Sequence, residues 1–304
     1  MIRVRHISKR YRDTVAVDDV SLDVREGEVF GLLGPNGAGK TTTMEMVEGL
    51  RPPDTGEIVI DGLDVVRERQ RVKKVIGIQL QATALFERLT VREMLRLYAS
   101  FYGETQPTQD ILSRFHLEEK AEDWVKHLSG GQKQRLAIGL AVIHDPKVLF
   151  LDEPTTGLDP QARRGLWDII HTLQQSGKTI VLSTHYMEEA EALCDRIAIM
   201  DAGKVIALDT PSGLIRRLDS DSVVEFVVPD GLDVSRFQSL AGVKRVKKVD
   251  DGKGVQLLTD ALQQTLKELI DLSEHGTFKI NGLRTRTATL EDVFLHLTGK
   301  RLKD

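Results

Sequence analysis

Short aliphatic and β-branched runs alternate with longer stretches of helical periodicity along the first two thirds of the chain. The alternation predicts strands, and between them helices. The strands are expected at residues 28–33, 75–78, 148–151, 179–183 and 196–200, and the helices around residues 40–50, 91–101, 131–143, 161–175 and 186–194. The segments VLFLD and TIVLS show no polar alternation, as expected of strands covered on both faces. The pattern indicates an α/β fold with substantial parallel character in its sheet.

The two ends of the chain follow other patterns. The first 25 residues hold two strand-like segments split by Tyr11-Arg-Asp, which predicts an antiparallel hairpin layered on the main sheet. Pro and Gly near residues 208–213 signal a boundary, and we expect domains at 1–218 and 219–304. The second shows the order strand, helix, strand, strand, helix, strand, helix. This order predicts a small α+β domain of split βαβ type with an added helix.

Composition narrows the range of functions. The 304 residues are 40% hydrophobic and 29% charged, which is typical of a globular protein with about two domains. The net charge of −4 gives no sign of a nucleic-acid surface, so no nucleic-acid partner is expected. Cys194 is the only cysteine, which excludes an internal disulfide and fits a reducing compartment. No segment has the roughly 18 consecutive apolar residues that span a bilayer, so any membrane role is expected to be peripheral.

A glycine-rich segment at residues 34–41 is the first candidate site. It reads Gly-Pro-Asn-Gly-Ala-Gly-Lys-Thr and lies between an apolar strand and a helical run, which is the setting of a P-loop. Glycines let successive backbone N–H groups face a phosphate, and the helix adds the positive end of its dipole. Lys40 would reach the outer phosphate oxygens and Thr41 would coordinate Mg²⁺. The residues expected to bind nucleotide here are Gly34, Pro35, Asn36, Gly37, Ala38, Gly39, Lys40, Thr41 and Thr42.

Two adjacent carboxylates end the predicted strand at 148–151, where α/β sheets place their sites. Side chains alternate along a strand, so Asp152 and Glu153 can share one site only if the chain turns, and Pro154 is where it could turn. The natural division places Asp152 on Mg²⁺ and Glu153 on the attacking water as general base.

Residues 128–132, Leu-Ser-Gly-Gly-Gln, open another helix. Such an exposed N-terminus is a second phosphate-binding end within one chain, and a single nucleotide does not need two of them in one subunit. With this motif the sequence resembles the nucleotide-binding subunits of ABC transporters over residues 2–215. The resemblance rests on GPNGAGKTT, Gln81, LSGGQ, VLFLDEP, GLD at 157–159 and His185 in STH.

The resemblance implies the fold and the assembly. The fold would be a P-loop NTPase cassette with a mixed sheet core, an antiparallel β layer and a helical subdomain at about 82–145. The cofactors would be ATP and Mg²⁺. The assembly would be a head-to-tail homodimer, in which the LSGGQ segment of one copy closes on the γ-phosphate held by the P-loop of the other. That segment contributes Ser129, Gly130, Gly131 and Gln132.

Further roles are implied residue by residue. Tyr11 would stack on adenine, Gln81 would contact the metal and sense the membrane partner, and Asp159 would communicate across the dimer. His185 would contact the γ-phosphate and hold the attacking water. This chain reads Gln79-Leu-Gln where the family commonly has Pro before its Gln, so Gln79 stays an alternative to Gln81.

The presence of Glu153 and His185 favours hydrolysis over a non-hydrolysing switch. The final helix, TLEDVFLHLTGK, resembles the C-terminal extension of ATPase subunits of ABC-2 type exporters. We therefore expect a cytoplasmic exporter ATPase at the inner face of the cell membrane, with its permease on a separate chain. The alternative is an ABC ATPase acting on nucleic acid or the ribosome, but such relatives usually carry long coiled-coil insertions or two cassettes. For the second domain we prefer regulation or dimer stabilisation.

Overall fold

The computed structural model describes residues 1–80, 85–220, 222–229, 231–249, 254–275 and 278–299. The chain forms two compact units, Met1–Thr210 and Pro211–Leu302. Helix α8 (Pro211–Arg216) belongs to the second unit, where it contacts α10 (Leu290–Thr298), so the division falls before residue 218. Within the described ranges, no helix has the length and apolar character needed to cross a membrane.

The first unit is built on a six-stranded sheet with the order β10-β9-β3-β8-β7-β6. Its strands are β3 (Val29–Leu33), β6 (Ile76–Gln79), β7 (Val148–Asp152), β8 (Thr179–Thr184), β9 (Arg196–Asp201) and β10 (Lys204–Asp209). All neighbours are parallel except β10, which pairs antiparallel with β9. Strands β3, β7 and β8 are buried along their whole length, as their uninterrupted apolar sequences predict. Because they run parallel, their carboxyl ends meet at one edge of the sheet.

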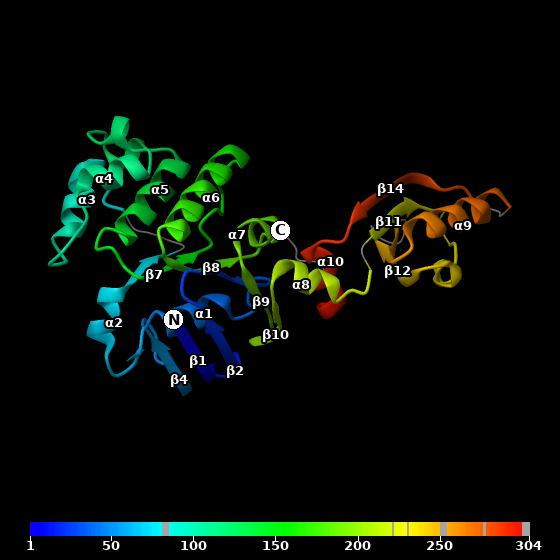
Figure 1. Ribbon diagram of the computed structural model, residues 1–304, viewed down its shortest axis with the longest axis horizontal. Coiled ribbons are helices and arrows are strands. Elements are labelled where there is room, and N and C mark those ends of the chain that lie inside the picture. The colour runs from blue at the N-terminus through cyan, green and yellow to red at the C-terminus, as the bar shows by residue number, and fades with distance from the viewer. Residues whose placement is uncertain (81–84, 221, 230, 250–253, 276–277, 300–304) are drawn as a thin grey trace. The chain divides into compact units, whose positions relative to one another are not determined.

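A second, antiparallel sheet of the first unit confirms the layer expected at the N-terminus (Figure 1). It has the order β2-β1-β4-β5. Its strands are β1 (Ile2–Tyr11), β2 (Thr14–Val24), β4 (Thr55–Ile60) and β5 (Leu63–Asp64). Val4 of this sheet shares one apolar core with Met44 of α1 (Lys40–Val47) and with Phe150 of the main sheet. Helix α1 is therefore held between the two sheets.

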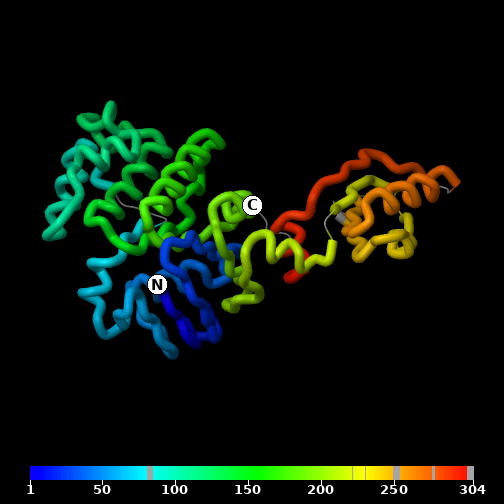
Figure 2. The backbone as a smooth tube through the Cα atoms, viewed as in Figure 1, coloured from blue at the N-terminus to red at the C-terminus, as the bar shows by residue number. Residues whose placement is uncertain are grey.

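The chain between β6 and β7 forms the helical part of the first unit, and Figure 2 shows its cyan and green segments gathered together. It contains α3 (Val91–Ala99), α4 (Thr108–Arg114), the 3₁₀ turns η1 (Glu118–Lys120) and η2 (Val125–His127), and α5 (Gly130–Ala141). The remaining helices of the unit are α2 (Arg69–Val75), α6 (Pro160–Gln175) and α7 (Met187–Leu193). Helix α5 packs on α3, α6 and β6, so it connects the helical part to the sheet.

The second unit has the antiparallel sheet order β12-β13-β11-β14. Its elements, besides α8 and α10, are β11 (Ser222–Val227), η3 (Val234–Ser239), β12 (Val243–Val249), β13 (Gly254–Thr259), α9 (Leu262–Glu274) and β14 (Asn281–Thr287). Strand β13 lies between β11 and β12, which is the split βαβ arrangement that the sequence predicts. One apolar core joins Val224 and Leu257 of the sheet to Phe237 of η3 and Leu269 of α9.

A charged network fixes α10 within the second unit. Arg286 of β14 donates to Asp292 of α10 at 2.6 Å and to Glu225 of β11 at 3.0 Å. Asp292 also accepts from the backbone N–H of Thr289 and so caps its own helix. Burial tends to raise the pKa of Asp292, but the hydrogen bonds from Arg286 and Thr289 hold it below its ordinary value. The carboxylate is therefore charged and paired at neutral pH.

We expect Asp292→Ala to destabilise the second unit by about 2 kcal/mol, because it leaves Arg286 without its strongest partner and removes the helix cap. The expected loss of stability is smaller than the loss on breaking a fully buried ion pair, because the Arg286 side chain is 34% exposed to solvent. Differential scanning calorimetry of the full chain checks this, with Asp271→Ala on the exposed side of α9 as the matched control. Equal transition midpoints for the two variants would contradict the assignment.

Candidate functional site

The glycine-rich loop between β3 and α1 has little room for side chains. A Cβ on Gly34 would lie 2.3 Å from the carbonyl oxygen of Met200, and a Cβ on Gly39 would lie 2.4 Å from that of Ala16. Gly39 also has a φ of 98°, which L side chains rarely adopt. These two positions require glycine, because the loop packs directly against the backbone at Met200 and Ala16.

The start of α1 is open to an anion. Gly39 occupies the N-cap position of the helix and has no side chain with which to cap the N–H groups of the first turn. Thr41 is exposed there and Thr42 is partly exposed. Lys40 is 4% exposed, and its Nζ donates to the carbonyl oxygens of Gly34 (2.8 Å) and Pro35 (3.2 Å). Burial lowers the pKa of Lys40, and the charges of Glu153 and Asp152 partly oppose this effect.

Asp152 ends β7 on the side that faces α1, because Val148 and Phe150, which precede it on alternate positions, belong to the core shared with that helix. Its Oδ1 accepts a hydrogen bond from Ser183 of β8. Burial raises the pKa of Asp152, while the hydrogen bond from Ser183 opposes the rise. A buried carboxylate whose charged form is penalised fits a place for a cation, and α1, which carries the Thr41 hydroxyl, contacts β7. Carboxylate and hydroxyl oxygens are ligands that Mg²⁺ prefers, and a bound Mg²⁺ would neutralise charge on the phosphate oxygens.

The two glutamine alternatives differ in position. Gln81 lies outside the described residues. Gln79 is buried at the end of β6, and its Nε2 donates to the carbonyl oxygen of Leu80 at 2.6 Å. It shares a face of the strand with Gly77, whose added Cβ would meet the carbonyl oxygen of Ala141 in α5. That face is opposite to the one that carries Asp152, which disfavours Gln79; the metal contact of Gln81 stays a prediction.

Glu153 and His185 meet at the same edge. Glu153 has a φ of 45°, so the chain turns at this residue, one position before the proline where the sequence suggested a turn. The turn brings Glu153 Oε1 to 3.3 Å from His185 Nδ1 and to 3.9 Å from Lys40 Nζ. The histidine and glutamate atoms are close but are not aligned as a hydrogen bond. Glu153 Oε2 accepts from Thr156 at 3.2 Å. A carboxylate held in this way is suited to accept a proton from water.

Ser129 caps α5 in the helical part. Its Oγ accepts from Gln132 N at 3.3 Å, and its own N–H donates to Gln132 Oε1 at 2.9 Å. Ser129 and Gly130 are exposed, and a Cβ on Gly131 would lie 3.0 Å from Ala162 Cβ of α6. The motif therefore forms an exposed helix tip, as expected.

Asp159 and Tyr11 lie at two other exposed positions. Asp159 caps α6 by accepting from the backbone N–H groups of Gln161 (3.0 Å) and Ala162 (2.9 Å). Tyr11 ends β1 with 37% of its surface exposed, and the guanidinium carbon of Arg51 lies 5.2 Å from its ring centroid. Their roles toward a second copy and toward adenine stay proposals.

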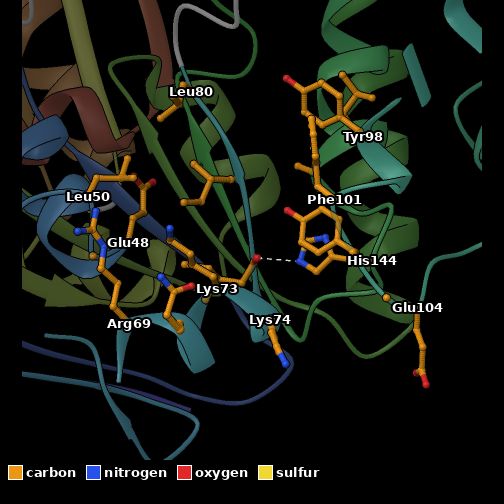
Figure 3. A pocket seen from close by; sticks show the side chains of 18 of the residues that line it. Glu48, Leu50, Arg69, Lys73, Lys74, Leu80, Tyr98, Phe101, Glu104 and His144 are labelled. Atoms are coloured by element: carbon orange, nitrogen blue, oxygen red, sulfur yellow. Dashed lines mark hydrogen bonds between the residues drawn. The ribbon is translucent and has the colours of Figure 1, made fainter. Parts of the chain in front are cut away.

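The sequence reasoning missed a groove of about 1020 Å³ between the sheet and the helical part (Figure 3). Glu48, Leu50 and Arg69 lie on one side of it, and Tyr98 and Phe101 lie on the other. Ile76 and Ile78 of β6 line it between these sides. Other lining residues are Leu80, Tyr102, Glu104, Lys73, Lys74 and His144.

Two residues beside these sites carried weak sequence signals. Glu48 is 4% exposed at the end of α1, and its Oε1 has no hydrogen-bond partner among the described residues. Its signal was a second acid, three residues after Glu45, in a largely apolar helical run. Ser183 was visible only as a polar residue at the end of an apolar strand, and its partner Asp152 is 31 residues away.

Comparisons with known proteins decide the family. The ABC transporter family model matches residues 17–156. The linearmycin resistance ATP-binding protein LnrL of Bacillus subtilis is 36% identical, with 100% of both chains covered. The Nod factor export ATP-binding protein I of Ralstonia nicotianae is 40% identical, with 100% of this chain and 95% of that protein covered. The chain belongs to the ABC transporter ATP-binding family.

Solved structures agree with this ABC assignment. An ATP-binding subunit of an ABC transporter is 32% identical and superposes with a TM-score of 0.65 over 72% of this chain and 93% of that one. The dimeric cassette MJ0796, in a post-hydrolysis state with ADP and Pi, is 28% identical, with a TM-score of 0.63 over 69% of this chain and 98% of that one. The predicted fold is confirmed. The chain is an ABC ATPase, with ATP as its substrate and Mg²⁺ as its cofactor.

We expect Glu153→Gln to retain ATP binding and to accumulate an ATP-dependent dimer, while steady-state hydrolysis falls by about 100-fold or more, because the general base is lost. Size-exclusion chromatography with Mg-ATP and a phosphate-release assay measure the two effects. Glu188→Gln, on the exposed side of α7, is the matched control. Hydrolysis at the normal rate in Glu153→Gln would show that another group is the base.

Glu48 gives a pH dependence with a definite sign. Burial, together with the charges of Asp152 and Glu45, raises the pKa of Glu48 to about 8 from an ordinary value of 4.5. Between these values the folded chain holds a proton that the unfolded chain has released, so Glu48 lowers stability progressively as pH rises. We expect Glu48→Gln to stabilise the nucleotide-free chain, and to do so more at pH 8 than at pH 5. Urea unfolding measures this difference, with exposed Glu57→Gln as control; an equal effect at both pH values would contradict it.

Proposed function

We propose that this ABC ATPase is the ATP-hydrolysing subunit of an exporter. Two copies would close head to tail on ATP at the inner face of the cell membrane and drive a permease on a separate chain. The proposal rests above all on the groove between the sheet and the helical part. The groove lies beside the catalytic edge, and its large surface is typical of one that binds another protein. Charge of both signs and exposed apolar side chains lie together there.

The proposed dimer is supported by two helix N-termini in different parts of the first unit. The first turn of α1 follows the glycine loop, and its N-cap, Gly39, brings no side chain to it. The tip of α5 is exposed and begins in the helical part. Each N-terminus favours negative charge, so a second copy can place its α5 tip on the phosphate bound at α1 of the first. Closure driven by such a shared ligand requires that ATP binds the closed state more tightly than the open one.

The permease contact is supported by the chemistry of the groove. Leu50 is 43% exposed, Leu80 43% and Phe101 67%, and apolar side chains gathered in this way mark interaction sites. Arg69, Lys73 and Lys74 of α2 supply positive charge at the same groove. We propose that a polar-ended helix or loop of the permease binds here, because it would bury the apolar wall and pair with the charged rim.

The proposed direction of transport is supported by the relatives. They are named for linearmycin resistance and Nod factor export, and their similarity extends over the whole chain, including the second unit. We propose export on this ground.

We expect Phe101→Asp to abolish binding to the permease while ATP-dependent dimerisation in the Glu153→Gln background persists, because the change adds a charge to the apolar wall of the groove alone. Co-purification from detergent-solubilised membranes, after co-expression with the transmembrane protein encoded in the adjacent reading frame, measures the binding. The expected loss is at least about tenfold, as for the central apolar residues of interfaces.

Val66→Asp is the matched control, since Val66 is 55% exposed and does not line the groove. Retained binding by Phe101→Asp would exclude the groove as the permease site. Recovery of ribosomes or nucleic acid in place of a membrane protein would contradict the exporter function itself.

A further inference from the structure

A series of stacked side chains connects the first turn of α6 to His185. The guanidinium carbon of Arg163 lies 4.6 Å from the centroid of the Tyr186 ring. That ring packs on the imidazole of His185, with centroids 4.1 Å apart and planes inclined at 41°. His185 in turn has its Nδ1 3.3 Å from Glu153 Oε1. Four residues from three segments of the chain therefore form one continuous contact path that ends at the catalytic carboxylate.

The α6 end of this path is anchored. The backbone N–H of Arg163 donates to the carbonyl oxygen of Asp159, in the turn that Asp159 caps. One turn further along α6, Trp167 Nε1 donates to Glu189 Oε1 of α7 at 3.2 Å. Glu189 has no exposed surface, so this hydrogen bond lies in the interior and ties α6 to α7. The helix that carries Arg163 is thereby fixed against the helix that follows Tyr186.

The imidazole itself has few other constraints. The backbone beside it is fixed, because Tyr186 N donates to Thr184 Oγ1 at 2.9 Å. The ring can still turn about its side-chain torsions unless a neighbour restricts it. Tyr186 supplies a broad flat neighbour, and Arg163 lies against the tyrosine ring. Arg163 Nε is buried and has no hydrogen-bond acceptor in the described part of the chain, and the guanidinium lies over the tyrosine ring at cation–π distance.

We infer that Arg163 and Tyr186 are positioning residues that fix the orientation of His185 beside Glu153. The inference rests on the proposed role of His185 in hydrolysis. The guanidinium holds the tyrosine ring, and the tyrosine ring limits how far the imidazole can turn. Asp159 caps the helix that carries Arg163, so the path begins one turn from this cap.

The proposed effect of Arg163 and Tyr186 on the orientation of His185 is tested by NMR of the full, nucleotide-free chain labelled with ¹³C-histidine. The His185 signal is assigned by its loss in His185→Ala. Arg163→Gln is expected to shift this signal, although the contact runs through Tyr186. Arg164→Gln, at the exposed neighbouring position, is the matched control and is expected to leave the signal in place. An unchanged His185 signal in Arg163→Gln would overturn the inference.

The functional half is tested by single-turnover hydrolysis of Mg-ATP. Tyr186→Ala and Arg163→Gln are expected to slow hydrolysis by about tenfold with ATP affinity changed less than about twofold, because only the alignment of the catalytic group is lost. Tyr186→Phe keeps the ring and is expected to match the wild type. In a His185→Ala background, Tyr186→Ala is expected to add no further loss.

Equal losses from Tyr186→Ala in both backgrounds, or full activity in that variant, would overturn the positioning role. Thermal unfolding of each variant identifies any that fails to fold, and Tyr186→Leu then replaces Tyr186→Ala. Wild-type hydrolysis by His185→Ala would instead refute the proposed role of His185, and the NMR comparison distinguishes that outcome from a failure of the stack.

Discussion

The catalytic edge depends on charged groups that are buried at the end of an apolar sheet, where a charge is stable only if it is matched. Lys40 and Asp152 are each at least 95% removed from solvent. Burial lowers the pKa of Lys40 and raises that of Asp152, so the interior opposes the charged form of both groups. An anionic phosphate bound with a divalent cation relieves both penalties at once. The same arrangement of buried charges therefore determines both nucleotide binding and the electrostatic stability of this edge.

Features determined by neighbouring residues could be predicted from the sequence. The strand, the glycine loop and Lys40 follow one another without interruption, so the motif is readable locally, although the close approaches that require Gly34 and Gly39 come from the distant residues Met200 and Ala16. The capping of α5 by Ser129 is likewise a three-residue relation. The split βαβ order of the second unit follows from alternating periodicities alone.

Features determined by contacts between distant segments could not be predicted in the same way. Ser183 acts on Asp152 because β7 and β8 are neighbours in register, which no local pattern specifies. Helix α8 joins the second unit because it packs on α10, near the other end of that unit's sequence. The groove forms only where β6, α1, α2 and the helical part come together. Only then is Glu48, one of its acidic lining residues, recognisable as part of a site.

The groove and the phosphate site are built partly from the same structural elements, and these elements connect the two sites directly. Helix α1 has Lys40 at its start and Glu48 directly after its end, and its eight residues span about 12 Å within the core. Strand β6 lines the groove and pairs in register with β7, which ends in Asp152. The charge of Asp152 adds to the effect of burial in raising the pKa of Glu48. A cation that neutralised Asp152 would make the charged form of Glu48 less costly, so the charge state of Glu48 is linked to occupancy of the metal site.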